Sequence, residues 1–407
     1  MTRTFVIVGA GPAGATAAAT LREEGFDGRV VLIGDERHPP YERPPLSKEY
    51  LRAEYGLDDM LLRPPGWYEE RGVEFLSGSR AGRLDLAERE IELSSGERVR
   101  FDRALVATGA RNRRIGAPGD GLAGVFDLRR IEDADRIRER AGSGARVAIV
   151  GMGFVGAEVA ASLRQIGCEV EVVEPLETAM VGVLGPDLGR VVEVLHRDHG
   201  VRMHFGEALE RFEGIAEVEA LVTSSGRRIE CDFAVVGVGV QPNVELAREA
   251  GLPTPNGIVV SPVLQTANPD VFAAGDVALH DHPRFGPVRV EHHDNALKMG
   301  QAAARNMLRE PVPFDDPHWF WSDQFDVNIQ VAGVATSWDG VVVRGSVEDR
   351  SFSAFFLREG RVLSVVGLNR PRDVRRAMAL VRAGARPDPA ALRDEAVDLR
   401  TLAPARA

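Results

Sequence analysis

The stretch Phe5-Val-Ile-Val-Gly9-Ala-Gly11-Pro-Ala-Gly14 decides the fold of this 407-residue chain. Its first four residues are apolar and are typical of a buried parallel strand, and the alanine-rich residues 13–24 are typical of a helix. In a GxGxxG turn, the first glycine permits a tight bend, the second lets the backbone approach a pyrophosphate, and the third lets helix and strand pack closely. A second strand is expected at 29–33, and Asp35 and Glu36 after it are placed to accept hydrogen bonds from a ribose.

A second copy of this pattern begins in the middle of the chain. The segment Arg146-Val-Ala-Ile-Val150 leads into Gly151-Met-Gly153-Phe-Val-Gly156, a predicted helix at 157–165 and a predicted strand at 169–173 that ends at Glu174. A single GxGxxG is a weak signal. Two complete units, each with a carboxylate roughly 20 residues after the last glycine, predict two bound dinucleotides.

A longer repeat relates the two halves of the chain. The segment 93–109 (LSSG…D…G) is matched by 223–239 (TSSG…D…G) with the same spacings. Each copy predicts a hairpin turn followed by a buried strand, at 104–107 and at 234–238. Another buried strand is expected just before Gly275-Asp276, so the second module is inserted into the first.

Composition and charge exclude several classes of protein. The chain is 44% hydrophobic and 27% charged with a net charge of −11, which is typical of a globular protein and argues against nonspecific nucleic-acid binding. The two cysteines, Cys168 and Cys231, form no CxxC pair and no ligand set for zinc or an iron–sulfur cluster, so redox chemistry needs a bound cofactor. Lysine occurs only at Lys48 and Lys298, which makes both candidates for a role that arginine cannot take.

Neither a membrane segment nor a metal site is predicted. No apolar run reaches the roughly 18 residues of a membrane span, and the first motif leaves no room for a signal peptide, so we expect a cytoplasmic location. The segments His280-Asp-His282 and Glu291-His-His-Asp294 contain metal-ligand residue types. The first precedes a Pro/Gly loop and the second opens a predicted helix at 296–308, so we expect no metal.

Four segments point to a known family: Tyr41-Glu-Arg-Pro-Pro-Leu-Ser-Lys48, Ala107-Thr-Gly109, Ala273-Ala-Gly-Asp276 and Trp319-Phe-Trp-Ser-Asp-Gln324. The chain resembles the two-dinucleotide flavoprotein reductases, and within them the NADH-dependent, FAD-containing ferredoxin reductases of cytochrome P450 and ring-hydroxylating dioxygenase systems. The resemblance implies an α/β fold with two Rossmann-like, glutathione-reductase-like domains and a C-terminal α+β domain. It places an FAD domain at 1–112 and 241–316, an NAD domain at 113–240 and a C-terminal reductase domain at 317–407.

The resemblance also implies which residues bind the cofactors. The FAD residues would be Gly9, Gly11, Ala13, Gly14, Asp35, Glu36, Arg43, Lys48, Ala81, Thr108, Gly109, Arg129, Asp276, His293 and Trp321. The NADH residues would be Gly151, Gly153, Gly156, Glu158, Glu174 and Gly239. The expected catalytic residues are Lys48, Glu158 and Trp321.

Lys48 and Glu174 can also be argued from their chemistry. An ammonium near a flavin stabilises negative charge on the reduced ring, and Glu158 is the expected partner that keeps Lys48 from being an unpaired buried charge. Glu174 favours NADH over NADPH, because a carboxylate accepts hydrogen bonds from a ribose hydroxyl and repels a 2′-phosphate. Two alternatives stay open, namely that Lys48 is an ordinary surface residue and that Trp321 is a core aromatic.

A basic segment near the C-terminus predicts a docking surface. Residues 340–386 contain ten arginines and four acidic residues, and the densest part is Arg370, Arg372, Arg375 and Arg376. This charge favours an acidic [2Fe-2S] ferredoxin as the partner. The alternative is that these arginines simply cover a solvated face.

The expected function is that of an NADH:ferredoxin oxidoreductase. A hydride passes from NADH to FAD, and single electrons then pass to a [2Fe-2S] ferredoxin that feeds a cytochrome P450 or a Rieske-type oxygenase. One alternative is a flavoprotein with a small acceptor such as oxygen, peroxide or a quinone, although the redox cysteine usual in related oxidases and peroxidases is missing after the first module. A second alternative is a redox-signalling binding protein whose oligomeric state responds to NADH.

Overall fold

The computed structural model describes residues 3–404, which fold into two compact units. Each unit is built from three separate stretches of chain. Unit 1 contains residues 3–43, 56–111 and 240–318, and unit 2 contains residues 44–55, 112–239 and 319–404.

Unit 1 is built on a parallel sheet with the strand of the first glycine turn at its centre. The strand order is β19-β7-β1-β2-β3, and the strands are β1 (Thr4–Val8), β2 (Arg29–Ile33), β3 (Val73–Leu76), β7 (Arg103–Val106) and β19 (Val271–Ala273). The residues of β1, β7 and β19 are almost all buried and apolar, as expected for a parallel sheet that is covered on both faces.

Two helices of unit 1, α1 (Pro12–Glu23) and α7 (His293–Leu308), pack against each other at short range. A Cβ atom added at Gly300 would lie 2.2 Å from the carbonyl oxygen of Ala13, so a glycine is needed for this approach. The alanine-rich sequence of α1 leaves room for the same contact. The start of α1, which follows the first glycine turn, is thereby fixed against α7.

Unit 2 repeats the plan of unit 1. Its parallel sheet has the order β12-β11-β10-β16-β9, and the strands are β9 (Val125–Asp127), β10 (Arg146–Val150), β11 (Glu169–Glu174), β12 (Arg202–Phe205) and β16 (Phe233–Val236). The strand of the second glycine turn, β10, is again central. Helix α4 (Phe154–Ile166) follows β10, and helix α5 (Val181–Asp198) follows β11.

The repeat extends to a three-stranded antiparallel sheet in each unit. The first copy consists of β4 (Ala81–Asp85), β5 (Glu90–Leu93) and β6 (Arg98–Arg100), and the second of β13 (Leu209–Glu213), β14 (Ala220–Thr223) and β15 (Arg228–Glu230). The register shifts between Ala81 and Arg83 in the first copy and between Leu209 and Arg211 in the second. The predicted sequence repeat is therefore a structural repeat, and the hairpins predicted at the two SSG segments are confirmed.

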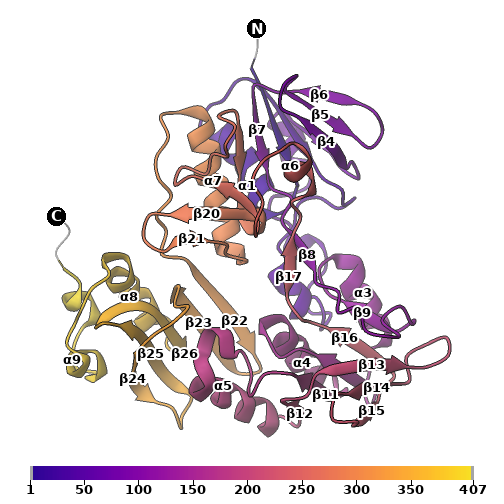
Figure 1. The fold of residues 1–407 in the computed structure, drawn as a ribbon, viewed down its shortest axis with the longest axis vertical. Coiled ribbons are helices and arrows are strands. Elements are labelled where there is room, and N and C mark those ends of the chain that lie inside the picture. The colour runs from indigo at the N-terminus through magenta and orange to yellow at the C-terminus, as the bar shows by residue number, and fades with distance from the viewer. Residues whose placement is uncertain (1–2, 405–407) are drawn as a thin grey trace. The chain divides into compact units, whose positions relative to one another are not determined.

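The C-terminal part of unit 2 is an antiparallel sheet with helices against it (Figure 1). The strand order is β22-β23-β26-β25-β24, with α8 packed on β23 and β26 and α9 on β24. The elements are β22 (Trp319–Gln324), β23 (Val327–Gly333), β24 (Gly340–Ser346), β25 (Ser351–Arg358), β26 (Arg361–Leu368), α8 (Pro371–Ala383) and α9 (Pro389–Arg393).

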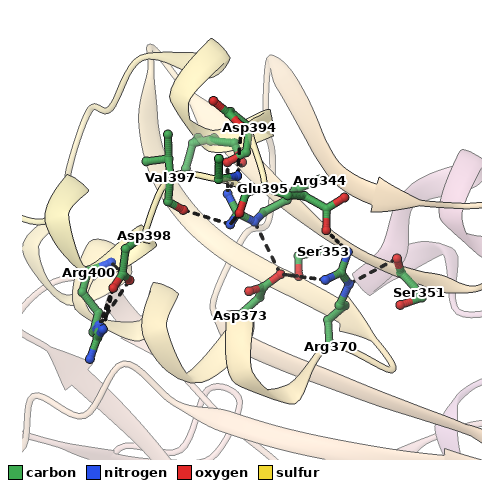
Figure 2. A network of polar contacts seen from close by, with 12 residues as sticks. Arg344, Ser351, Ser353, Arg370, Asp373, Asp394, Glu395, Val397, Asp398 and Arg400 are labelled. Carbon is green, nitrogen blue, oxygen red and sulfur yellow. Dashed lines mark hydrogen bonds and ion pairs between the residues drawn. The ribbon is translucent and has the colours of Figure 1, made fainter.

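Arg344 of β24 is almost completely buried and fixes the last segment of unit 2 (Figure 2). Its two terminal nitrogens donate hydrogen bonds to four carbonyl oxygens of the segment 392–397, at 2.6–3.3 Å. Its Nε lies 3.5 Å from a carboxylate oxygen of Asp373 in α8. Because a guanidinium presents five N–H donors in a fixed fork, one side chain fastens both the helix and the terminal segment to the sheet.

The remaining elements are short strands and helices. β8 pairs with β17, and β18, β20 and β21 form a small sheet in unit 1. Their bounds and those of the other short elements are α2 (Trp67–Glu70), α3 (Ile131–Arg140), α6 (Glu245–Glu249), β8 (Ala110–Asn112), β17 (Val240–Pro242), β18 (Ile258–Val260), β20 (Ala278–His282), β21 (Gly286–Val288), η1 (Pro44–Ser47), η2 (Asp58–Met60), η3 (Gly275–Val277) and η4 (Leu399–Leu402). Within residues 3–404, no helix combines the length and the apolar character needed to cross a membrane.

Candidate functional site

The first glycine turn has the shape of a pyrophosphate cradle. Gly9 has φ +110°, and a Cβ atom there would lie 2.2 Å from the carbonyl oxygen of Ala107. A Cβ atom at Gly14 would lie 1.8 Å from the carbonyl oxygen of Gly9, so the third glycine is needed where helix and turn meet. A Cβ atom at Gly11 would meet nothing within 4 Å, which leaves the backbone of the second glycine open to a phosphate.

The second glycine turn has the same shape. Gly151 has φ +101° and faces the carbonyl oxygen of Gly237, which a Cβ atom would approach to 2.5 Å. A Cβ atom at Gly156 would lie 2.1 Å from the carbonyl oxygen of Gly151, whereas one at Gly153 would meet nothing within 4 Å. Each unit therefore has a turn whose residues fit a dinucleotide pyrophosphate.

A charged cluster follows β2 in unit 1. Glu36 accepts hydrogen bonds from the hydroxyl of Tyr41 and from the guanidinium of Arg43, both at 2.6 Å, and Asp35 beside it is exposed. Burial by itself lowers the pKa of Arg43, but Tyr41, Glu36 and Asp276 outweigh it and raise the pKa above its ordinary value. Arg43 is thus held as a cation with Asp276 close by.

Two further predicted FAD residues, Ala13 and Thr108, lie near strand ends of unit 1. Ala13 lies against Gly275, where a Cβ atom would come within 3.0 Å of the Ala13 methyl carbon, so the start of α1 meets the end of β19. Thr108 exchanges two hydrogen bonds of 2.8 Å with Asn243. The sequence did not single out Asn243, although it lies in the QPN segment after Gly239.

The other predicted FAD residues lie on several elements. In unit 1, Ala81 begins β4, Gly109 follows β7 with φ +63°, and His293 begins α7. In unit 2, Arg129 lies just before α3, where its backbone N–H donates to the carboxylate of Asp133 at 3.0 Å. Their roles toward FAD stay predictions.

Lys48, the buried one of the two lysines, forms the ion pair that the sequence predicts. Within unit 2, Nζ of Lys48 lies 3.2 Å from Oε2 of Glu158, and the two side chains are 5% and 8% exposed. Glu158 accepts two further hydrogen bonds, from the hydroxyl of Ser47 and from the hydroxyl of Ser322 at 2.7 Å. These extra donors matter because a buried ion pair is favourable only when its remaining hydrogen-bonding capacity is satisfied. Neither serine was expected from the sequence to contact Glu158.

Successive side chains of β22 point to opposite faces of the strand, so Trp321 and Ser322 lie on different faces. Trp319 and Trp321 lie on one face of the strand with stacked rings, 5.3 Å between centroids. Phe320, Ser322 and Gln324 lie on the opposite, buried face. The Ser322 face meets Glu158, whereas Trp321 lies on the opposite face of the strand.

Glu174 ends β11 and is fixed by two backbone amides. Its carboxylate oxygens accept hydrogen bonds from the N–H of Met152 at 2.7 Å and from the N–H of Leu176 at 2.9 Å. Met152 lies inside the second glycine turn, so the carboxylate is tied directly to that turn. Gly239, with φ +89°, comes after β16, which pairs with the other side of β10.

Neither cysteine is placed for thiol chemistry. Cys168 and Cys231 are both buried and unpaired with each other. Burial raises the pKa of Cys168 and raises the pKa of Cys231 to about 12, so both stay protonated thiols at neutral pH. In residues 3–404, no three His, Cys, Asp or Glu side chains are grouped as a metal site.

The four predicted docking arginines are not equivalent. Arg370 forms an ion pair with Glu395 and donates to the carbonyl oxygen of Ser351 at 3.3 Å, so it belongs to the network around Arg344 (Figure 2). Arg372 and Arg375, on α8, are exposed, and Arg376 is half-buried.

Two parallel sheets, each with a glycine turn that fits a pyrophosphate, define an oxidoreductase that uses two dinucleotides. The chain belongs to the pyridine nucleotide-disulphide oxidoreductase family, whose model matches residues 3–300. A second model, described as the reductase C-terminal domain, matches residues 319–403.

Known relatives match the chain over nearly its whole length. It is 41% identical to the probable ferredoxin reductase CtmF of Castellaniella defragrans, over 90% of this chain and 91% of that protein. It is 36% identical to the ferredoxin–NAD(+) reductase component of the anthranilate 1,2-dioxygenase system of Burkholderia cepacia, over 98% of both chains. The crystal structure of the ferredoxin reductase for the CYP199A2 system from Rhodopseudomonas palustris matches with a TM-score of 0.95 at 37% identity, over 99% of this chain and 100% of that one. The predicted family resemblance and fold class are confirmed.

Proposed function

We propose that this chain is an FAD-dependent NADH:ferredoxin oxidoreductase that supplies electrons to a cytochrome P450 or a ring-hydroxylating oxygenase. The observation that carries the proposal is the pair of glycine turns with open second glycines, because a chain with two such turns can bind both a flavin and a nicotinamide dinucleotide. The relatives named as ferredoxin reductases support a ferredoxin acceptor, and the Burkholderia cepacia relative supports NAD as the nicotinamide nucleotide.

The residues of the chain would bind the cofactors and set the charge around them. Bound FAD would take a hydride from NADH and release single electrons. We assign the turn 9–14 to the FAD pyrophosphate and the turn 151–156 to the NADH pyrophosphate. Lys48 supplies positive charge for the flavin, and Glu158 compensates that charge in the dry interior. The predicted domain division and the other predicted FAD and NADH residues are part of this proposal.

The acceptor is tested by mixing FAD-loaded protein and NADH with cytochrome c, with and without a series of [2Fe-2S] ferredoxins. We expect fast cytochrome c reduction only when a ferredoxin is present. Full activity without ferredoxin would favour the small-acceptor alternative. Slow flavin reduction together with NADH-driven dimerisation would favour the signalling alternative. The buried, protonated cysteines already disfavour an acceptor reaction that uses a thiolate.

Glu174→Ala is expected to narrow the preference for NADH over NADPH by about tenfold in the ratio of kcat/KM. Loss of the carboxylate removes a charge-assisted hydrogen bond to the ribose, worth about 1.5–3 kcal/mol, and removes the repulsion of a 2′-phosphate. Steady-state kinetics with both nucleotides measure the ratio. Glu174→Gln is the matched control, because it keeps an oxygen acceptor of the same shape while it removes the charge. An unchanged ratio in both variants would take Glu174 out of the nucleotide site.

Charge reversal at Arg372 and Arg375 is expected to lower kcat/KM for the ferredoxin by about tenfold and to flatten its salt dependence. The expectation rests on steering of an acidic partner by exposed charge. The control is the double variant Arg71→Glu and Arg248→Glu, which makes the same charge change at two exposed positions of unit 1. If this control has the same effect, the net charge of the protein and not α8 determines the rate.

A cytoplasmic location is proposed as well. Both cysteines are free thiols, which is typical of a reducing compartment. Fractionation of cells that produce the protein tests this.

A further inference from the structure

A chain of buried polar side chains leads from α5 to Glu158. It runs from His196 in α5 through Gln324 and Ser322 in β22 to Glu158 in α4, all within unit 2. The distances are 2.9 Å from His196 Nε2 to Gln324 Oε1, 3.0 Å from Gln324 Nε2 to Ser322 Oγ, and 2.7 Å from Ser322 Oγ to Glu158 Oε1. His196, Gln324 and Ser322 have no exposed surface at all, so water does not compete for these bonds.

The hydrogen bonds along this series of side chains all donate in the same direction, from His196 toward Glu158. The Oε1 atom of an amide only accepts, so Nε2 of His196 must donate to Gln324. Burial lowers the pKa of His196 to about 4, so its ring is neutral and carries this single N–H. The amide N–H of Gln324 then donates to the oxygen of Ser322, and the one proton of the serine hydroxyl is left for Glu158.

We propose that Ser322 is a positioning residue for Glu158 in hydride transfer, and that Gln324 and His196 fix the direction of its hydroxyl. The proposal rests on the proposed function, because that function gives Glu158 its role beside the nicotinamide and Lys48. Ser322 engages Oε1 of the carboxylate, whereas Ser47 and Lys48 engage Oε2. With both oxygens held, the carboxylate cannot rotate, and the Lys48 ammonium keeps one position.

The sequence pattern of β22 explains why these residues occupy this place. Alternation along the strand puts Ser322 and Gln324 on its buried face, together with Phe320. A buried serine and glutamine are costly unless their polar atoms are paired. Here each polar side chain donates a hydrogen bond to the next one, and the last acceptor is the Glu158 carboxylate of the ion pair.

The experiment compares two variants of the FAD-loaded protein with wild type. Ser322→Ala removes the donor to Glu158. Gln324→Glu keeps the shape of the side chain, but an ionised carboxylate at 324 would accept the serine proton and withdraw it from Glu158. The control is Ser353→Ala, because Ser353 is also fully buried in the C-terminal sheet and also faces a buried carboxylate, that of Asp373 at 3.3 Å. The measurements are the limiting rate constant of flavin reduction by NADH between pH 6 and pH 9, the Kd of NAD⁺ for the oxidised protein, and the Tm.

The expected results distinguish a positioning role of Ser322 from a role in stability alone. Ser322→Ala should lower the limiting rate constant about tenfold at every pH and weaken NAD⁺ binding. Gln324→Glu should be slow at pH 9 and should recover toward pH 6, where a protonated carboxyl again donates to Ser322. Ser353→Ala should lower the Tm without changing the rate constant.

Two outcomes bear on different claims. Wild-type rate constants and wild-type NAD⁺ affinity in both Ser322→Ala and Gln324→Glu would overturn the inference. Normal flavin reduction by NADH in the wild-type protein, without electron transfer to any ferredoxin, would contradict the proposed function and leave the positioning role of Ser322 standing.

Discussion

Lys48→Met is expected to slow the reduction of bound flavin by NADH about a hundredfold. The substitution removes the cation that would stabilise negative charge on the reduced flavin, and loss of one such electrostatic group costs about 10²–10³ in rate. It also leaves Glu158 buried without an ionic partner. Lys48→Arg is expected to lose less, about tenfold, because a planar guanidinium does not fit a space shaped for an ammonium. In both variants, the FAD content of the purified protein should fall less than the rate of flavin reduction. Stopped-flow absorbance of the flavin measures the rates, and the flavin content of the purified protein measures retention.

The second lysine is a natural control for this prediction. Lys298 pairs with Asp294 and Asp316 at 2.6 and 3.2 Å, but its side chain is 35% exposed. Lys298→Met therefore removes a lysine with two acidic partners outside the Lys48 cluster. If the two methionine variants reduce flavin at the same rate, Lys48 has no special role.

Arg344→Met is expected to destabilise the C-terminal sheet by about 3–5 kcal/mol. The substitution removes the nearest cation of the buried carboxylate of Asp373 and leaves four carbonyl groups of the segment 392–397 without their donor. Thermal unfolding should show a lower Tm, and limited proteolysis should cut after residue 388 before it cuts elsewhere. Arg400→Met is the matched control (Figure 2), because Arg400 is an exposed arginine near the same terminal segment and pairs with its neighbour Asp398, away from the hydrogen bonds of Arg344. A proteolysis pattern equal to that of wild type would show that Arg344 does not hold this segment.

The sequence predicted the parts of the fold that depend on local pattern. Each GxGxxG turn lies between an apolar strand and a helix, so the two parallel sheets and the insertion of one module into the other follow from spacing. The Lys48–Glu158 pair was also predictable, because a lysine in a family-specific segment needs a partner and Glu158 lies in the first turn after Gly156.

The parts that were missed depend on contacts between distant residues. Ser322 meets Glu158 across 164 positions of the chain, and no period in the sequence predicts such a contact. The available signal was the alternation in WFWSDQ, which puts Ser322 on the same face as Phe320. Arg344 and Arg370 were counted as part of a basic surface, whereas the structure buries Arg344 and pairs Arg370 with Glu395, because composition does not tell an inward-facing arginine from an outward-facing one.

The scarcity of lysine makes this protein unusually simple to label. Amine-directed reagents have two side-chain targets, and only Lys298 offers a substantial accessible surface, since the side chain of Lys48 is 5% exposed. A reporter group can therefore be attached at Lys298 without disturbing the Lys48 cluster. Modification of Lys48 itself requires the segment 44–55 to come away from α4, so mass spectrometry of the acylated protein would record how often that local opening occurs.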